Sequence, residues 1–215
     1  MMIQASFPTL QRLCMMFQLL RTLRGQAQTH TSSQDLASLC GTTAFSIRKD
    51  IATLGNTGNS GQGYEIEKLM NLIGDTLGLF HKKKVCVTGL GRLGSALLEH
   101  TGFNNDEFEV VAGFDSNVNK TETTKSSVPL YPFYQLNTII SRLGIEYGLI
   151  AVPARAAQEV ADKMVGSGVK GIINFAPVIV KSVNKQIFIR NVDMTSELRI
   201  LTAQYHINTV NSLNQ

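Results

Sequence analysis

A glycine-rich turn with the spacing of a phosphate-binding loop lies near the middle of the chain. It follows the apolar run KVCVTG and consists of Gly89, Leu90, Gly91, Arg92, Leu93 and Gly94. In such a turn the first glycine makes the bend, the second lets the backbone approach a pyrophosphate, and the third lets the next helix pack on the strand. The phosphates then lie at the positive end of that helix. Because a strand pattern precedes the turn and a helical pattern follows it, the sequence predicts a dinucleotide site.

An acidic residue stands where the ribose of such a dinucleotide should lie. The apolar run FEVVAGFD ends at Asp115, with Ser116 next, about 20 residues beyond the turn. A carboxylate there accepts hydrogen bonds from the ribose hydroxyls and repels a 2′-phosphate. The sequence therefore predicts NAD(H) rather than NADP(H); the alternative is an aspartate that only forms a turn.

Two further loops follow apolar runs and are expected to line the nicotinamide pocket, because ligands bind at the carboxyl ends of parallel strands. Their residues are Ala151, Val152 and Pro153 in the first loop, and Asn174, Phe175, Ala176 and Pro177 in the second. Alternatively, Pro153 only starts the following helix, a position that proline often takes.

The elements that must position these residues differ between the two parts of the chain. Residues 8–80 have helical periodicity with a glycine-rich interruption. From Lys84 onward, short β-branched runs alternate with helical segments, which is typical of a parallel α/β sheet. The pattern predicts a domain over residues 1–80, a Rossmann-type domain over 81–192 and a C-terminal helix over 193–215.

The segment TSSQDLASLCGTTAFSIRKDIATLG has the pattern of two helices joined by a tight turn. In the second helix Ile47, Ile51 and Leu54 recur at i, i+4 and i+7 and should face the core. The residues expected to face outward are Ser46, Arg48, Lys49 and Thr53. This arrangement is typical of a helix-turn-helix whose second helix enters the major groove. The alternative is a helical hairpin with an ordinary charged face.

Closely spaced glycines then follow in NTGNSGQGYEI. Such a density suits a β-hairpin, the wing of a winged-helix domain, or alternatively a flexible loop. The residues of the predicted wing that would contact DNA are Asn59, Ser60, Gly61 and Gln62.

Composition excludes several classes of protein. The chain has 215 residues, 43% of them hydrophobic, and a formal net charge of +4. No apolar run approaches the ~20 residues that a membrane span requires. The three cysteines form no CxxC and are predicted to be small buried hydrophobes, and the four histidines have no metal-ligand spacing. We therefore predict a cytoplasmic protein without membrane or metal.

One helical segment follows the last predicted strand, so the chain has no evident substrate domain and no acid–base pair for catalysis. Asp193 should cap this helix, while Met194, Leu198, Leu201 and Tyr205 form an apolar face. Such a face needs a partner, and a second subunit is the natural one. A small NAD-dependent oxidoreductase or a CoA-binding domain are the alternatives to a non-enzymatic regulator.

Nearly the whole chain, in order, resembles the Rex proteins, redox-sensing transcriptional repressors of bacteria. The segments that carry the resemblance are FPTLQRL, SSQDLASLCG, SIRKDIATLG, GQGYEIEKL, GLGRLGSALL, GFDSN, AVPARAAQEVAD, GVKGIINFAPV and RNVDMTSEL. The combination of INFAPV with RNVD is far more specific than the glycine turn.

The resemblance implies an α/β protein with an N-terminal winged-helix DNA-binding domain, a Rossmann domain for NAD(H) and a C-terminal helix swapped within a homodimer. It implies that NADH releases the dimer from a palindromic operator. By matching position, Arg48 and Lys49 should contact DNA. Arg12 and Asp193 match residues that pair between the DNA-binding domain and the swapped helix.

The chain departs from the family pattern at two places. The predicted wing carries GNSGQG where basic residues are common, which predicts weaker DNA binding with a shallower salt dependence. His100 stands where the family has a tyrosine of the redox switch, and an imidazole can replace its hydrogen bond or change charge near neutral pH. These departures leave open a Rex-like dinucleotide-binding regulator with altered DNA recognition.

Overall fold

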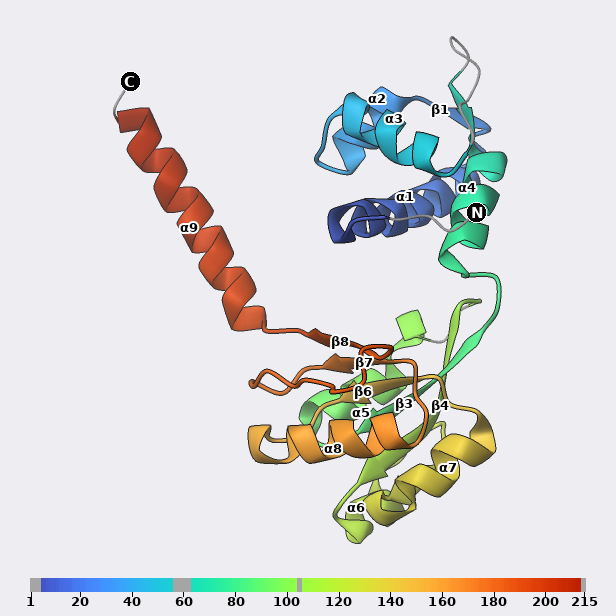
Figure 1. Cartoon of the computed structure of the whole chain (residues 1–215), viewed down its shortest axis with the longest axis vertical. Helices are drawn as coiled ribbons and strands as arrows, with labels where there is room; N and C mark the ends of the chain where they lie inside the picture. The colour runs from blue at the N-terminus through green and yellow to red at the C-terminus, as the bar shows by residue number, and fades with distance from the viewer. Residues whose placement is uncertain (1–4, 56–62, 104–105, 214–215) are drawn as a thin grey trace. The chain divides into compact units, whose positions relative to one another are not determined.

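The computed structural model of the chain describes residues 5–55, 63–103 and 106–213. The chain divides into two compact units, Met1–His81 and Lys82–Gln215 (Figure 1). Within the described residues, no helix combines the length and the apolar character needed to cross a bilayer.

The first unit is mainly helical. Its elements are α1 (Phe7–Gly25), β1 (His30–Thr31), α2 (Ser33–Leu39), α3 (Ala44–Thr53), β2 (Tyr64–Glu65) and α4 (Ile66–Leu77). Ser32 caps α2 in a reciprocal capping box with Asp35, and Thr43 caps α3 through the Ser46 N–H. The predicted pair of helices joined by a tight turn is confirmed.

The core of this unit forms where the apolar faces of its helices meet. Ile47, Ile51 and Leu54 of α3 and its C-cap are buried, as their spacing predicts. They pack with α1, α2 and α4 in one cluster that includes Leu13 and Ile73. The prediction of three buried cysteines is confirmed for Cys86 and wrong for Cys14 on α1, which is exposed, while Cys40 is only partly buried.

The two short strands of this unit pair with each other in antiparallel register, His30 with Glu65 and Thr31 with Tyr64. The sequence pattern did not predict β1, since two residues are too short for a period. This sheet holds the end of the predicted wing beside the start of α2. The wing residues Asn59, Ser60, Gly61 and Gln62 lie outside the described residues.

The second unit alternates strands and helices. Its elements are β3 (Lys83–Thr88), α5 (Arg92–Glu99), the short 3-10 helix η1 (Thr101–Phe103), β4 (Phe108–Asp115), α6 (Val118–Thr123), β5 (Leu130–Pro132), the 3-10 helix η2 (Phe133–Gln135), α7 (Leu136–Leu143), β6 (Tyr147–Ile150), α8 (Ala154–Gly166), β7 (Gly171–Asn174), β8 (Phe188–Asn191) and α9 (Met194–Leu213).

The described strands of this unit form a six-stranded, wholly parallel sheet in the order β5-β4-β3-β6-β7-β8. This is the strand order of the doubly wound dinucleotide-binding fold, so the predicted Rossmann-type domain is confirmed. One cluster packs α7 and α8 on one face of the sheet, and another packs α5 on the opposite face (Figure 1). Strand β5 was not predicted, because its three residues show no alternation.

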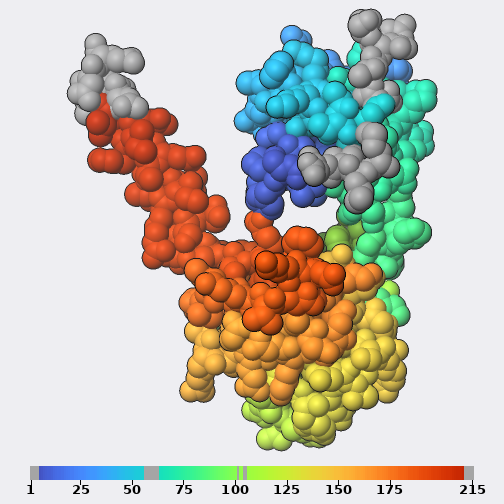
Figure 2. Space-filling model, viewed as in Figure 1, coloured from blue at the N-terminus to red at the C-terminus, as the bar shows by residue number. Residues whose placement is uncertain are grey.

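Helix α9 exposes apolar side chains on more than one of its faces. Figure 2 shows this helix, in red, projecting from the rest of its own unit. The exposed residues are Met194, Leu198, Ile200, Leu201, Tyr205, Ile207 and Val210. Burial of such side chains is the main driving force of association, so this helix has the surface of a subunit contact.

Candidate functional site

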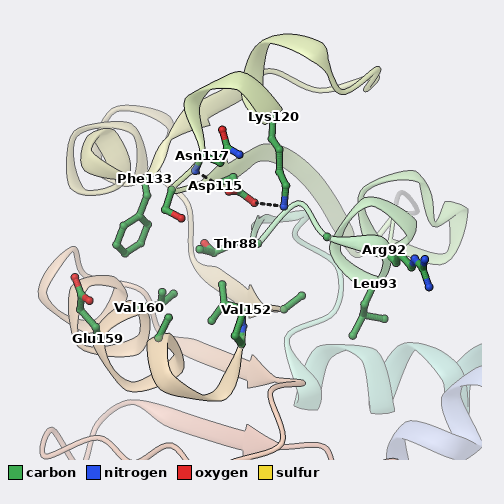
Figure 3. A pocket seen from close by; sticks show the side chains of 16 residues that line it. Thr88, Arg92, Leu93, Asp115, Asn117, Lys120, Phe133, Val152, Glu159 and Val160 are labelled. Carbon is green, nitrogen blue, oxygen red and sulfur yellow. Dashed lines mark hydrogen bonds and ion pairs between the residues drawn. The ribbon is translucent and has the colours of Figure 1, made fainter.

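A cavity of about 750 Å³ lies at the carboxyl end of the parallel sheet (Figure 3). The strand order reverses between β3 and β6, which is where open parallel sheets bind ligands. The volume of the cavity falls within the range of roughly 300–1,000 Å³ that is typical of small-molecule and cofactor sites. It is lined by Thr88, Gly89, Gly91, Arg92, Leu93, Asp115, Ser116, Asn117, Lys120, Phe133, Ala151, Val152, Pro153, Ala156, Glu159 and Val160.

The three glycines of the turn meet three different requirements. Gly89 has φ +100°, and a Cβ there would lie 2.5 Å from the carbonyl oxygen of Ala151. A Cβ at Gly94 would lie 1.6 Å from the Gly89 carbonyl oxygen, so only glycine lets α5 pack this closely on the turn. A Cβ at Gly91 would meet no heavy atom of the described chain within 4 Å. That open position leaves space for a ligand against the backbone.

The helix behind this turn begins without a side-chain cap. Gly91 is the N-cap residue of α5 and contributes no side chain to the first-turn amides. An N-terminus of this kind carries partial positive charge and points backbone N–H groups outward, so it binds phosphate. Arg92 lines the same end of the cavity and adds a full positive charge.

Asp115 is 7% exposed and joins the glycine turn to the loop that follows β4. Its Oδ2 accepts the Leu90 N–H at 2.7 Å, and its Oδ1 accepts the Asn117 N–H at 2.8 Å. The ammonium of Lys120 lies 3.6 Å from Oδ2 (Figure 3). The carboxylate therefore braces the glycine turn as well as lining the cavity.

Thr88, the last residue of β3, places a polar atom at the floor of the cavity (Figure 3). The residue is 2% exposed, and its Oγ1 has no hydrogen-bond partner among the described residues. A buried hydroxyl without a partner is costly, at roughly 1–3 kcal/mol. A ligand group that supplies the missing partner removes this cost, so the residue favours an occupied cavity.

Apolar side chains form another part of the cavity wall. Figure 3 shows Phe133, Val152 and Val160 around this part of the cavity. The Lys163 ammonium lies over the Phe133 ring, 4.4 Å from its centroid, and holds the ring in place. A planar apolar group such as a purine base fits against this wall. A phosphate end, a carboxylate and an apolar end together fit a nucleotide cofactor.

The structure brings together most of the residues that the sequence predicts for the cofactor. The predicted residues that line the cavity are Gly89, Gly91, Arg92, Leu93, Asp115, Ser116, Ala151, Val152 and Pro153. The predicted residues that do not line it are Leu90, Gly94, Asn174, Phe175, Ala176 and Pro177. Leu90 and Gly94 shape the turn instead.

Asn174 is fully buried and organises the loop that follows β7. Its side-chain amide donates to the carbonyl of Val178 at 2.7 Å and to Oδ1 of Asn191 at 2.9 Å. Its Oδ1 accepts the Ala176 N–H at 3.0 Å. This asparagine shapes the loop from within, and its side chain is occupied by these contacts.

The sequence analysis missed several residues that line the cavity. They are Thr88, Asn117, Lys120, Phe133, Ala156, Glu159 and Val160. Thr88 has a local signal, because it immediately precedes the glycine turn on a predicted strand. Phe133 follows the unpredicted strand β5, so only the folded sheet brings it to the cavity.

In the first unit, α3 presents one exposed stripe. Its exposed residues are Phe45, Arg48, Lys49 and Ala52, at i, i+3, i+4 and i+7. The Arg48 guanidinium donates to Oγ of Ser33 on α2 at 3.0 Å. The two predicted cations thus lie side by side on the outer face of the second helix, as a nucleic-acid contact requires.

Ser46 and Thr53 lie beside the stripe and are partly buried. Oγ of Ser46 is 3.0 Å from the Thr43 hydroxyl that caps the helix, and Oγ1 of Thr53 donates to the Asp50 carbonyl at 2.6 Å. Their hydroxyls therefore take part in local hydrogen bonds of the helix, while Phe45, which the sequence analysis did not select, stands on the exposed face.

Arg12 forms a bidentate ion pair with Asp50, whose Oδ1 accepts from Nη2 at 2.9 Å. Asp50 is 2% exposed and belongs to the buried side of α3. This hydrogen bond raises the pKa of Arg12 above its ordinary value. The pair joins α1 to α3, so Arg12 positions the helix that carries Arg48 and Lys49.

Asp193 caps the start of α9, as the sequence predicts. Its carboxylate accepts the Thr195 N–H at 3.0 Å and the Ser196 hydroxyl at 2.7 Å. These hydrogen bonds lower the pKa of Asp193, and the bond from the Ser196 hydroxyl contributes more than the bond from the Thr195 N–H. The carboxylate is exposed and lies 3.8 Å from Arg199.

His100 forms the C-cap of α5 and is exposed. Its ring packs edge-on against Phe103, with 5.0 Å between the ring centroids. A Cβ at Gly102 would lie 2.6 Å from its Nε2. His100 does not line the cavity, and it is held over the η1 turn that follows α5.

Comparison with known proteins identifies both units. The family described as "CoA binding domain" matches residues 80–178, and the family described as "Putative DNA-binding protein N-terminus" matches residues 5–52. The redox-sensing transcriptional repressor Rex of Carboxydothermus hydrogenoformans is 37% identical over 194 residues, which cover 90% of this chain and 93% of that relative.

Two solved structures of a Rex-family repressor, RSP, are similar over nearly the full length. RSP in complex with beta-NADH has a TM-score of 0.84 and 27% identity, and the match covers 99% of both chains. RSP in complex with beta-NAD⁺ and operator DNA has a TM-score of 0.86 and 29% identity, covering 98% of this chain and 95% of that one. The sequence identity, the two matched units and the shared fold lead to one conclusion: the chain belongs to the Rex family of redox-sensing transcriptional repressors.

Proposed function

We propose that the chain is a redox-sensing repressor that binds palindromic operator DNA as a homodimer and leaves it when NADH binds. The observation that carries this proposal is the presence, in one chain, of a nucleotide-shaped cavity and a helix-turn-helix with a basic outer face. The relatives are named as transcriptional repressors rather than as enzymes, and RSP structures contain NADH, or NAD⁺ with operator DNA.

Different residues of the cavity bind different parts of NAD(H). The uncapped N-terminus of α5 and Arg92 receive the pyrophosphate, and Asp115 accepts hydrogen bonds from ribose hydroxyls. Phe133 and Val152 provide the apolar wall for the adenine. The nicotinamide ring supplies the signal, because its reduced form is neutral and its oxidised form carries a positive charge. The loop at 174–177 stays a prediction for the nicotinamide end.

The DNA-binding unit uses Arg48 and Lys49 as its central contacts, and residues 59–62 of the predicted wing are proposed as further contacts. The C-terminal segment 193–215, which contains α9, serves as the dimerisation element and is swapped between subunits. A dimer places two copies of α3 on the two halves of a palindromic operator. The chain acts in the cytoplasm, where both NAD(H) and chromosomal DNA are present in bacteria.

Arg12, His100 and Asp193 are the proposed switch residues. Arg12 holds Asp50 in the described structure, so pairing with Asp193 would exchange one carboxylate for another. Such an exchange has two discrete arrangements, and a ligand with different affinity for each can shift their populations. The cofactor thereby controls the orientation of the helix that reads DNA.

Fluorescence anisotropy with a Rex-type palindromic operator tests this function. NADH is added at constant NAD⁺ and fixed moderate salt, with Asp115→Ala as a cofactor-site variant and a double Arg48→Ala, Lys49→Ala variant as a DNA-site variant. We expect tight binding that NADH releases, a weaker response in the first variant and no binding in the second. Binding that NADH leaves unchanged would refute the redox response, and binding that NADH strengthens would reverse the proposed polarity. No binding at any ratio would refute the repressor.

CoA is a second candidate ligand, because the matched family over residues 80–178 is described as a CoA binding domain. CoA carries a phosphate on its adenosine ribose, and the carboxylate of Asp115 disfavours a phosphate at that ribose. Competition of CoA against bound NADH, followed by NADH fluorescence, separates the two. Displacement of NADH by an equimolar amount of CoA would favour the second candidate.

A further inference from the structure

The exposed stripe of α3 contains an aromatic residue among its cations. Phe45 is 70% exposed, although the other large apolar side chains of this helix, Ile47 and Ile51, are 0% and 1% exposed. Phe45 precedes Arg48 by three residues and Lys49 by four, so the ring lies on the same face as both cations. The ring contributes little to the core of this unit.

The position of Phe45 along the helix limits what it can contact. It is the second residue of α3, directly after the Thr43 cap and Ala44. In a helix-turn-helix the N-terminal residues of the second helix reach the base edges, and the residues that follow contact the flanking phosphates. Arg48 and Lys49, with their positive charge, attract the polyanion that would bring Phe45 against the bases.

An apolar ring has one matching group in the major groove. The base edges there present hydrogen-bond donors and acceptors, and only thymine adds an apolar group, the C5-methyl. Phe45 has no donor or acceptor, so contact with any other base edge would leave polar groups without partners. Resting on the proposed DNA-binding function, we propose that Phe45 is a specificity-determining residue that reads thymine methyl groups in each operator half-site.

The experiment begins with a selection from DNA duplexes that carry palindromic, randomised half-sites, using the full-length chain. A parallel selection uses Phe45→Ala. We expect the wild-type chain to enrich thymine at one or two positions of each half-site, and the variant to lose that preference while it keeps its preferences at the other positions. Enrichment of a half-site without thymine would overturn the inference.

The second step removes only the methyl group. Deoxyuridine replaces the enriched thymine in both half-sites, which keeps the base-pairing edge unchanged. For the wild-type chain, we expect affinity to fall about fourfold per half-site, the equivalent of one buried methyl group. For Phe45→Ala we expect equal affinity for the thymine and the uracil duplexes.

Tyr134→Ala is the matched control, since Tyr134 is an aromatic residue of the other unit with 75% exposure. It should keep the full sensitivity to uracil. An unchanged thymine-to-uracil ratio in Phe45→Ala would overturn the inference, as would an equal loss of affinity for both duplexes, which would mean a contact elsewhere. Failure of the wild-type chain to enrich any sequence would instead refute the proposed DNA binding itself, and this inference with it.

Discussion

Replacement of Asp115 by alanine separates the two contributions of this residue to the cofactor site. The carboxylate accepts the N–H groups of Leu90 and Asn117 at 2.7 and 2.8 Å, and it lies 3.6 Å from the Lys120 ammonium. The substitution removes both hydrogen bonds and leaves the lysine without its ion pair to Asp115. It therefore changes the turn that receives the phosphates as well as the ribose contact.

The expected loss of stability follows from the burial of the two N–H groups. A hydrogen bond to a charged group contributes roughly 1.5–3 kcal/mol. Leu90 is 4% exposed, so water cannot readily replace the carboxylate there, whereas Asn117 is exposed and its N–H becomes hydrated. We expect the free energy of unfolding of the second unit to fall by about 2 kcal/mol, mainly through Leu90.

The expected loss of affinity is separate. NADH should bind at least about tenfold more weakly, which corresponds to ~1.4 kcal/mol. The ribose hydroxyls lose their acceptor, and the glycine turn loses one of the two hydrogen bonds that join it to the end of β4, while the bond from the Gly89 N–H to the Phe114 carbonyl remains. Operator release should then require proportionally more NADH.

The measurements are NADH fluorescence titration and urea unfolding without cofactor. Asp115→Asn keeps one neutral acceptor and should lie between the wild type and the alanine variant, and Asp162→Ala, an exposed aspartate of α8, should change neither quantity. Wild-type affinity in Asp115→Ala would refute the reasoning. A lower free energy of unfolding with unchanged NADH affinity would mean that Asp115 stabilises the glycine turn but does not contact the cofactor.

Three further predictions concern single side chains. Thr88→Val replaces a buried hydroxyl that has no hydrogen-bond partner among the described residues. The free energy of unfolding of the cofactor-free chain, measured by thermal unfolding, should rise by about 1 kcal/mol while NADH affinity falls about fivefold; unchanged affinity would exclude a cofactor contact. Arg12→Met leaves the buried carboxylate of Asp50 without its ion pair to Arg12. The free energy of unfolding, measured with urea, should fall by about 3 kcal/mol, and the additional substitution Asp50→Leu should restore part of it. The pKa of Asp35 lies below its ordinary value of 3.8 because of hydrogen bonds from its capping partner, so its contribution is complete above that value and is lost as the pH falls through the lowered pKa. Unfolding followed between about pH 5 and pH 2 should therefore show a smaller acid destabilisation in Asp35→Asn than in the wild type, and identical pH profiles would contradict this.

The local patterns of the sequence are sufficient for much of the cofactor site. The glycine turn, its flanking strand and helix, and Asp115 lie within one βαβ segment, where spacing along the chain translates directly into position. The buried positions of α3 are predictable for the same reason, since Ile47 and Ile51 follow the helical period.

Other parts of the site have no local signal. Phe133 reaches the cavity because the short strand β5 adds to the edge of the sheet, and Arg12 meets Asp50 across 38 positions of the chain. The hydrogen bonds of the Asn174 side chain to Val178 and Asn191 also have no local signal, because they depend on how the loop after β7 folds back.

By itself, the sequence determines the two-part organisation, the parallel α/β order and the residues that bend around a phosphate, since these depend on periodicity and on backbone conformations that particular residues allow. Only the tertiary structure decides which hydroxyls of α3 are engaged in local hydrogen bonds and that Phe45 lies on the exposed stripe. It also decides that the Thr88 hydroxyl, at the floor of the cavity, has no partner within the part of the chain that the structure describes. Those outcomes depend on packing between segments distant in the sequence, where burial and the satisfaction of each polar group select the partner.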